Sequence, residues 1–260
     1  MIVLSETPSF RKPPVIEVSF GIQFSRIEQW QTRHFGEFWS RVKDKFKGSA
    51  DAPPLEFQAG GPPTVQLLLL PPLRRVIFAT EDQTSLLQVQ DNRFHFNWRQ
   101  LKTEDTYPRF GSLFPQFKEW FGVFSEFLQE KKLGEAKPIR FELTYINHIG
   151  VAEDFSKELE RTVKLFNWSA VSPQYLAAPT TVTAAWQFDM PDKLGVMGAN
   201  LTHVKTAESK ELLVLALNCV GESVDLSQMD LWFESAHRSI VFGFTDLTTE
   251  AAHKLWEREQ

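Results

Sequence analysis

An order of secondary-structure elements that occurs twice along the chain limits the folds open to it. Apolar residues alternate with polar or small ones over residues 15–24, which predicts a half-buried strand. We then expect an amphipathic helix at 35–46, a loop at 48–63, strands at 64–70, 75–80, 85–90 and 93–100, and a long helix at 110–132. The second occurrence has a strand at 139–149, a helix at 154–166, strands at 181–190, 196–206 and 211–220, and helices at 226–242 and 248–256.

This order predicts an α+β fold of two similar halves. Each half is expected to be an antiparallel sheet of about four to five strands with one short and one long helix packed on one face. Residues 1–14 should form an extended arm, because Pro13 and Pro14 disfavour helix before them. The halves cover 15–134 and 135–260 and should make one compact, pseudo-duplicated unit, with two curved sheets that join edge to edge or pack as a pair.

Composition excludes several classes of protein. The 260 residues are 42% hydrophobic and 23% charged, as in a globular protein. The net charge of −5 provides no global basic field for nucleic acid or anionic lipid. The longest apolar stretch, residues 65–73, is too short to span a bilayer, and the N-terminus does not resemble a secretory signal. Cys219 is the one cysteine, so no internal disulfide can form and the chain is expected to be cytoplasmic. No membrane partner and no cofactor are expected.

The first candidate site lies at the end of the strand at 139–149, which contains Tyr145, Asn147 and His148. A histidine and an asparagine in this position can orient a substrate or take part in acid–base chemistry. Strand alternation puts Tyr145 and Asn147 on one face and His148 on the other, which weakens a single site built from all three. The alternative is that Asn147 and His148 satisfy backbone groups where the strand ends.

The second candidate site combines Asn97, Trp98 and Arg99 with Tyr107 and Arg109. Arginines beside aromatic rings can stack on a base or bind a phosphate or carboxylate. Three further arginines fall in the same predicted meander and would enlarge a local basic patch: Arg74, Arg75 and Arg93. The alternative is a tryptophan in the core, with arginines that are solvated or paired with nearby carboxylates.

Metal and nucleophile sites find no support in the sequence. His237 and His253 do not belong to an HxxxH or HExxH motif, and no cysteine pair completes a metal shell, so no metal site is predicted. His237 falls on the apolar face of its helix and is expected to be a core residue. Cys219 follows an apolar run and is expected to be a buried, inert thiol.

The aromatic composition is unusual, with 23 Phe and 8 Trp against 3 Tyr. Most of these residues recur at helical or alternating spacing, which is typical of core positions. Phe10, Trp30 and Phe57 lie in polar or loop contexts and are expected to be exposed. Large exposed aromatic side chains often mark protein interfaces.

Several phrases of the sequence match one known family. They are residues 13–18, 97–99, 107–110, 142–149, 236–237, 240–241 and 244–248, followed by His253 and Trp256. The chain resembles, over nearly its whole length, a sporadically distributed bacterial family that is named only for its scattered occurrence. The resemblance implies a bacterial origin and brings no catalytic residues with it.

Three functions remain open at this point. The first is a non-enzymatic protein-interaction module that binds another protein, as an inhibitory or sensing component of a toxin–antitoxin or phage-defence type system; scattered occurrence favours such mobile modules. The second is nucleic-acid or nucleotide binding through an Arg/Trp-lined sheet face around Trp98 and Arg99. The third is an enzyme with a site near Tyr145, Asn147 and His148.

Overall fold

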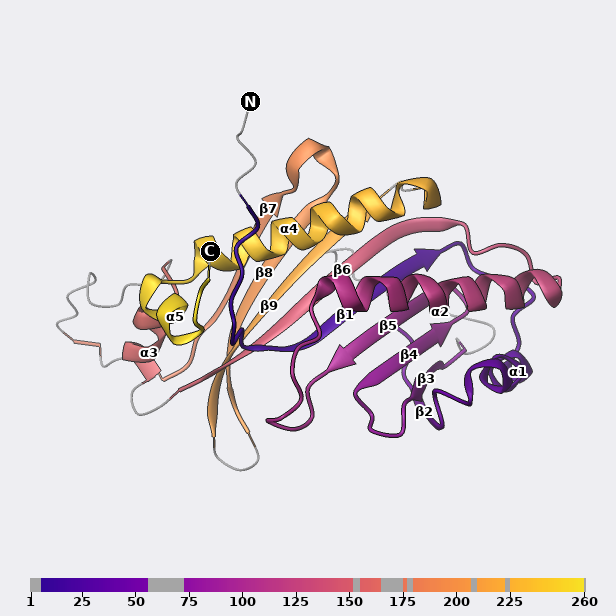
Figure 1. Ribbon diagram of the computed structural model, residues 1–260, viewed down its shortest axis with the longest axis horizontal. Coiled ribbons are helices and arrows are strands. Elements are labelled where there is room, and N and C mark those ends of the chain that lie inside the picture. Colours follow the sequence, from indigo (N-terminus) through magenta and orange to yellow (C-terminus); the bar gives the residue numbers. More distant parts are fainter. Residues whose placement is uncertain are drawn as a thin grey trace.

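One sheet carries all the strands of the described chain. The computed structural model describes residues 6–55, 73–151, 155–164, 175–176, 180–206, 210–222 and 225–259. Nine antiparallel strands among them lie in the order β2-β3-β4-β5-β1-β6-β9-β8-β7 (Figure 1). Their bounds are β1 Val15–Phe24, β2 Gly48–Ala52, β3 Arg75–Ala79, β4 Ser85–Gln90, β5 Arg93–Arg99, β6 Pro138–Gly150, β7 Thr183–Asp189, β8 Val196–Lys205 and β9 Glu211–Glu222. The α-helices are α1 Thr32–Val42, α2 Phe110–Glu130, α3 Phe155–Thr162, α4 Met229–Leu247 and α5 Glu250–Leu255.

The pairing of β1 with β6 at the centre makes the sheet continuous. The two strands run antiparallel, with Phe20 opposite Leu143 and Ile22 opposite Phe141. From this pair, strands β5, β4, β3 and β2 extend on one side and β9, β8 and β7 on the other. The predicted α+β class with an antiparallel sheet is confirmed. The two sheets expected to meet edge to edge or to pack as a pair form a single sheet, because the first strands of the two occurrences hydrogen bond to each other.

The core lies between one face of the sheet and the two long helices. Figure 1 shows α2 and α4 side by side across that face. Alternation along β1 directs Phe20 to the helices, where its ring lies 5.5 Å from that of Phe117 in α2. Phe141 of β6 lies 5.4 Å from Phe233 of α4, and Phe233 in turn lies 5.3 Å from Phe114 of α2. This layer of phenylalanine rings explains why the chain is so rich in that residue.

Shorter elements complete the fold at both ends of the sheet. In α1, Phe38 packs edge-on against Phe127 of α2 at 5.5 Å. At the opposite end, α5 lies beside α3 (Figure 1), and the Lys164 N–H donates to the carbonyl of Leu247 at the end of α4. None of the helices in the described ranges is long and apolar enough to cross a membrane.

Some sequence-based boundaries and exposures are wrong. The loop expected from residue 48 begins instead with β2, whose small residues pair with β3 at the edge of the sheet. Helix α4 continues past residue 242 to Leu247, where the Thr248 hydroxyl donates to the carbonyl of Phe244 at 2.6 Å. Phe10 and Trp30 are each only 4% exposed. The strand expected at 64–70 and the predicted exposure of Phe57 fall outside the described residues.

Candidate functional site

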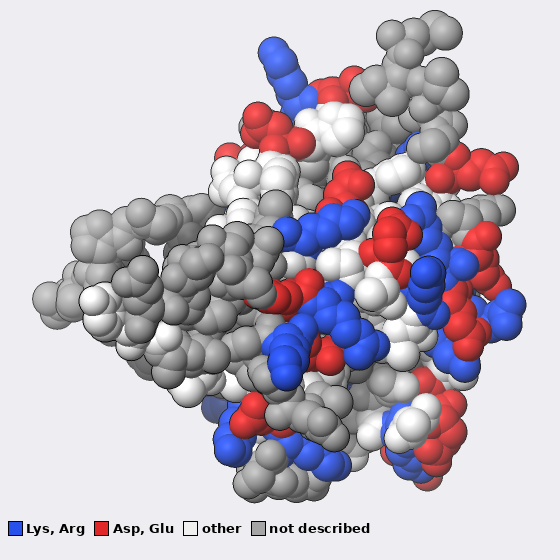
Figure 2. Space-filling view, turned by 90° about the vertical axis from the view of Figure 1, so that its left-hand side faces the viewer, with Lys and Arg blue, Asp and Glu red and all other residues white. Residues whose placement is uncertain are grey.

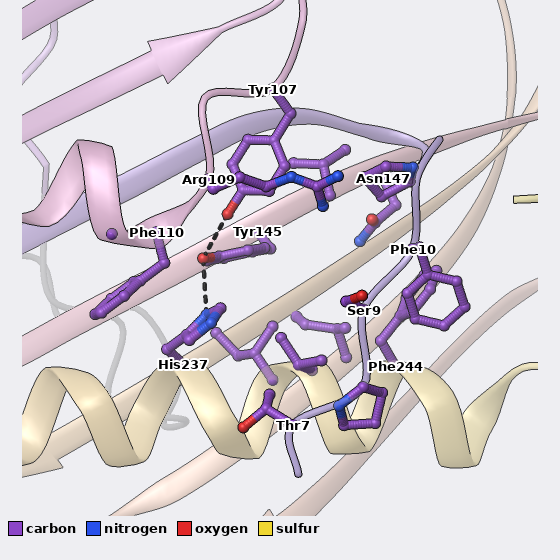
Figure 3. A pocket seen from close by; sticks show the side chains of 17 residues that line it. Thr7, Ser9, Phe10, Tyr107, Arg109, Phe110, Tyr145, Asn147, His237 and Phe244 are labelled. Atoms are coloured by element: carbon purple, nitrogen blue, oxygen red, sulfur yellow. Dashed lines mark hydrogen bonds between the residues drawn. The ribbon is translucent and has the colours of Figure 1, made fainter. Parts of the chain in front are cut away.

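A pocket of about 280 Å³ opens between the N-terminal arm, the sheet and α4 (Figure 3). We use "arm" for the described residues 6–14. Aromatic and aliphatic side chains form most of its walls, among them Phe10 of the arm, Phe110 at the start of α2, and Ile240 and Phe244 of α4. Its polar groups are fewer: Thr7, Ser9, Tyr107, Arg109, Tyr145, Asn147 and His237. A mainly apolar cavity with a few convergent polar groups is typical of small-molecule sites.

The arm reaches the pocket because it pairs with the C-terminal segment. The Arg11 N–H donates to the carbonyl of Glu257 at 2.9 Å, and the Lys12 N–H donates to that of Trp256 at 3.1 Å. The ring of Phe10 inserts edge-on against Phe244 at 5.4 Å. Although its neighbours in the sequence are polar, Phe10 belongs to the core because packing against Phe244 removes its ring from water.

Three side chains from separate elements form a hydrogen-bonded chain along one wall. The Tyr145 hydroxyl of β6 lies 2.9 Å from that of Tyr107, which precedes α2, and 3.0 Å from Nδ1 of His237 in α4 (Figure 3). The His237 ring also stacks on Phe110, with centroids 4.3 Å apart and planes 7° apart. We call Tyr107, Tyr145 and His237 together the hydroxyl chain. Its direction is set by the tautomer of His237.

Burial keeps the hydroxyl chain uncharged. It raises the pKa of Tyr107 to about 12 and that of Tyr145 well above its usual value. Burial, together with the nearby charge of Arg238, lowers the pKa of His237 to about 4. At neutral pH the wall therefore presents neutral hydrogen-bonding groups to the cavity.

Arg109 lies at the rim of the pocket in an unusual backbone conformation. Its φ of 72° and ψ of 156° belong to a region that glycine almost alone adopts. The guanidinium lies over the Tyr107 ring, 5.6 Å from its centroid, and donates a long hydrogen bond of 3.4 Å to the carbonyl of Arg11. Arg109 is also the N-cap residue of α2, so the first turn of that helix begins at the pocket.

The structure brings four of the eight predicted site residues together. Tyr107, Arg109, Tyr145 and Asn147 all line the pocket, although they come from both candidate sites. Asn147 is 1% exposed and donates to the carbonyl of Leu215 at 3.0 Å, so it satisfies a backbone group as the alternative interpretation held. His148 is not among the pocket residues, as strand alternation predicts.

Asn97, Trp98 and Arg99 do not share one surface. Trp98 faces the helices and packs at 5.5 Å from the ring of Tyr107, while its two neighbours in β5 point to the opposite face. The Asn97 amide donates to Glu17 at 2.6 Å, and Arg99 Nε donates to the carbonyl of Gln83 at 2.9 Å. Trp98 is only 5% exposed, so it presents no open ring for stacking.

Other arginines of the predicted basic patch are engaged within the protein. Arg93 is 5% exposed and pairs with Glu142 at 2.9 Å, beside the buried ring of His95. Arg75 donates to the Gln88 side chain at 2.6 Å, and Arg74 pairs with Asp51. Within the described residues these guanidinium groups are therefore held by partners on the sheet.

Charge on the molecular surface is mixed where it can be seen. Figure 2 shows the end of the molecule that carries α3 and α5, and basic and acidic side chains alternate over the described residues there. Ion pairs at this end include Arg161 with Glu158 at 3.7 Å and Arg258 with Glu250 at 3.9 Å. The described part of this face presents no continuous basic surface.

No metal-binding cluster of three or more His, Cys, Asp or Glu side chains occurs among the described residues. Cys219 is fully buried, and burial raises the pKa of its thiol to about 12.

Two parts of the pocket, His237 and the arm, were not predicted as site residues from the sequence. The rarity of tyrosine was the available signal, because two of only three tyrosines meet in the pocket.

Comparison with known proteins adds no assignment to this geometry. No protein-family model matches the chain, and no curated protein matches it at a significant level. Function therefore has to be inferred from the pocket itself.

Proposed function

We propose that the protein is a non-enzymatic binding module whose pocket holds a small, mainly apolar molecule. The observation that carries this proposal is the cavity of about 280 Å³ with aromatic walls and a neutral hydroxyl chain along one side. This volume is close to the lower end of ligand sites, which span roughly 300–1,000 Å³. The hydrophobic effect would favour transfer of such a ligand from water into the cavity, and the few polar groups would orient it there.

The hydroxyl chain favours recognition over catalysis. Phenylalanine fills most aromatic positions of the chain, and a phenol buried in its place costs free energy unless the hydroxyl is hydrogen bonded. Both hydroxyls are hydrogen bonded here, because that of Tyr145 bonds to the Tyr107 hydroxyl and to Nδ1 of His237. The raised pKa values make the two phenols weak acids and the lowered pKa makes His237 a weak base, whereas an effective acid–base pair has pKa values near the working pH.

We propose further that the module acts in the bacterial cytoplasm as a sensing component, and that another protein recognises the arm. The arm forms one wall of the pocket, so a ligand in the pocket contacts it directly. Its outer surface carries charges, with Arg11 and Lys12 paired to Glu257 at 3.4 Å and 2.5 Å. A partner that binds this surface would distinguish the filled pocket from the empty one.

The same proposal extends to the origin of the fold as a duplication of one α+β half. The support is the strand order on either side of the β1–β6 pair. In each half, the first strand lies at the centre and pairs with the last strand of a meander that runs from the edge of the sheet inward. In each half a long helix, α2 or α4, follows the meander and lies on the same face of the sheet.

The pocket is tested with N-phenylnaphthylamine, an uncharged dye that fluoresces in apolar cavities. We expect one dye molecule to bind per chain and Val241→Trp to abolish binding, because Val241 lines the cavity and a larger ring would fill it. Leu231→Trp is the matched control, since Leu231 is on the same helix and 61% exposed. Circular dichroism verifies that both variants fold. Unchanged dye affinity in folded Val241→Trp would refute the pocket as the binding site.

A further inference from the structure

We propose that the ligand of this pocket is a small apolar carboxylic acid, bound as its anion by the guanidinium of Arg109. This inference rests on the proposed binding function and adds the chemical class of the ligand. Medium-chain fatty acids and aryl-substituted acids belong to this class. The geometry points to it through the charges around the pocket, the position of Arg109 and the nature of the walls.

The first observation is that Arg109 has no carboxylate partner among the described residues. Its guanidinium contacts the ring of Tyr107 at 5.6 Å and the backbone carbonyl of Arg11 at 3.4 Å. The neighbouring cations do have carboxylate partners, since Arg11 pairs with Glu257 and Glu259 and Lys12 pairs with Glu257. An arginine fork left without an acid is suited to bind a carboxylate through two parallel hydrogen bonds.

The second observation concerns the charge of the whole cavity. None of the described residues that line it is Asp or Glu. Tyr107, Tyr145 and His237 are neutral near pH 7, because burial raises the pKa of the phenols and lowers that of the imidazole. Arg109 therefore carries the one formal charge among the described side chains that line the cavity, and a ligand with a single negative charge would balance it.

The third observation is how the chain positions this arginine. Arg109 adopts φ 72° and ψ 156°, a conformation unfavourable for any residue with a side chain, directly before α2. This places the guanidinium at the rim, while Phe110 and Gly111 of the first helical turn line the cavity. The first turn contains no acidic side chain, so the positive end of the helix dipole adds to the attraction for an anion.

The walls define the rest of the ligand. Phe10, Leu217, Ile240 and Phe244 line the pocket with apolar surface, and Figure 3 shows Phe10 and Phe244 among these side chains. A polyanion or a sugar would have to leave its polar groups unpaired against these side chains. A single carboxylate at the rim with a hydrocarbon body inside satisfies both regions.

The test compares decanoate with decanol, which has a similar body and no charge, as displacers of N-phenylnaphthylamine at about pH 7. We expect the full chain to bind decanoate at least about tenfold more tightly than decanol. Arg109→Gln should abolish this preference, read as the ratio of the decanoate and decanol affinities measured in the same variant. Arg11→Gln is the matched control, because it removes a nearby cation that already has acidic partners, and it should retain the preference.

Each other outcome overturns a defined part of the inference. Equal affinity for decanoate and decanol in the unmodified protein, or a preference that survives Arg109→Gln, would refute the carboxylate assignment while the pocket function stands. Dye binding that fails in the unmodified protein would refute the pocket function, and the carboxylate assignment with it. Dye binding with no displacement by either compound would refute the carboxylate assignment alone.

Discussion

Replacing Tyr145 by Phe removes the central hydroxyl of the hydroxyl chain and keeps the shape of the ring. The side chain is 3% exposed, and its oxygen lies 2.9 Å from the Tyr107 hydroxyl and 3.0 Å from Nδ1 of His237. The substitution breaks both hydrogen bonds and leaves two buried polar groups without that partner. We therefore expect the free energy of unfolding to fall by about 1–3 kcal/mol.

A double-mutant cycle makes this prediction specific. Tyr107→Phe breaks one bond only and should cost about 0.5–1.5 kcal/mol, whereas the double variant leaves His237 alone unpaired and should cost less than the two single changes added together. Urea denaturation followed by circular dichroism gives each value. Tyr175→Phe is the control with no expected effect, because that side chain is 95% exposed. The hydroxyl chain is refuted if Tyr145→Phe is as neutral as this control, or if the two changes are additive.

Three further changes should act on stability. Burial lowers the pKa of His95 and His237 to about 4, so between about pH 6.5 and pH 4 the unfolded chain binds more protons. The free energy of unfolding should therefore decrease as the pH is lowered across that window, by up to about 3 kcal/mol for His95 and by less for the half-buried His237. Urea titrations from pH 7 to 4.5 measure this decrease, and His237→Asn should make the free energy of unfolding less dependent on pH. Arg109→Gly should raise the free energy of unfolding by about 1 kcal/mol, because φ is 72° there; an unchanged or lower urea midpoint would contradict the strain. Phe10→Ala should cost about 3–5 kcal/mol through lost packing against Phe244, and limited proteolysis should then cut within the arm; a variant as resistant as the unmodified protein would contradict that packing.

Strand and helix periodicity predicted much of the fold because each pattern is local. The alternation in β1 and β6 identified both central strands, and the wide aromatic face of residues 110–132 identified α2 within two residues at either end. Strand alternation also separated His148 from Tyr145 and Asn147. The same rule applied to β5 would have separated Trp98 from Arg99, so that part of the second candidate site could have been corrected from the sequence.

The pocket could not be predicted because its parts are distant in the chain. Tyr107 and Tyr145 are 38 residues apart, and Tyr145 and His237 are 92 apart. No spacing rule links residues across such distances, and His237 fits the apolar stripe of α4 as well as any core residue. Phe10 is buried only because residues 256–259 pair with the arm, and a polar sequence context does not reveal that pairing.

The pairing of the arm with residues 256–259 also orders events during synthesis. Ser9 meets Glu259 across 250 residues, so this wall of the pocket is made early and finds its partner only after residue 259 has left the ribosome. The sheet contacts between β1 and β5 become available much sooner. A nascent chain can therefore fold its first long helix onto the sheet while the pocket is still open on one side. The arm would then close this side of the pocket only after residues 256–259 have left the ribosome.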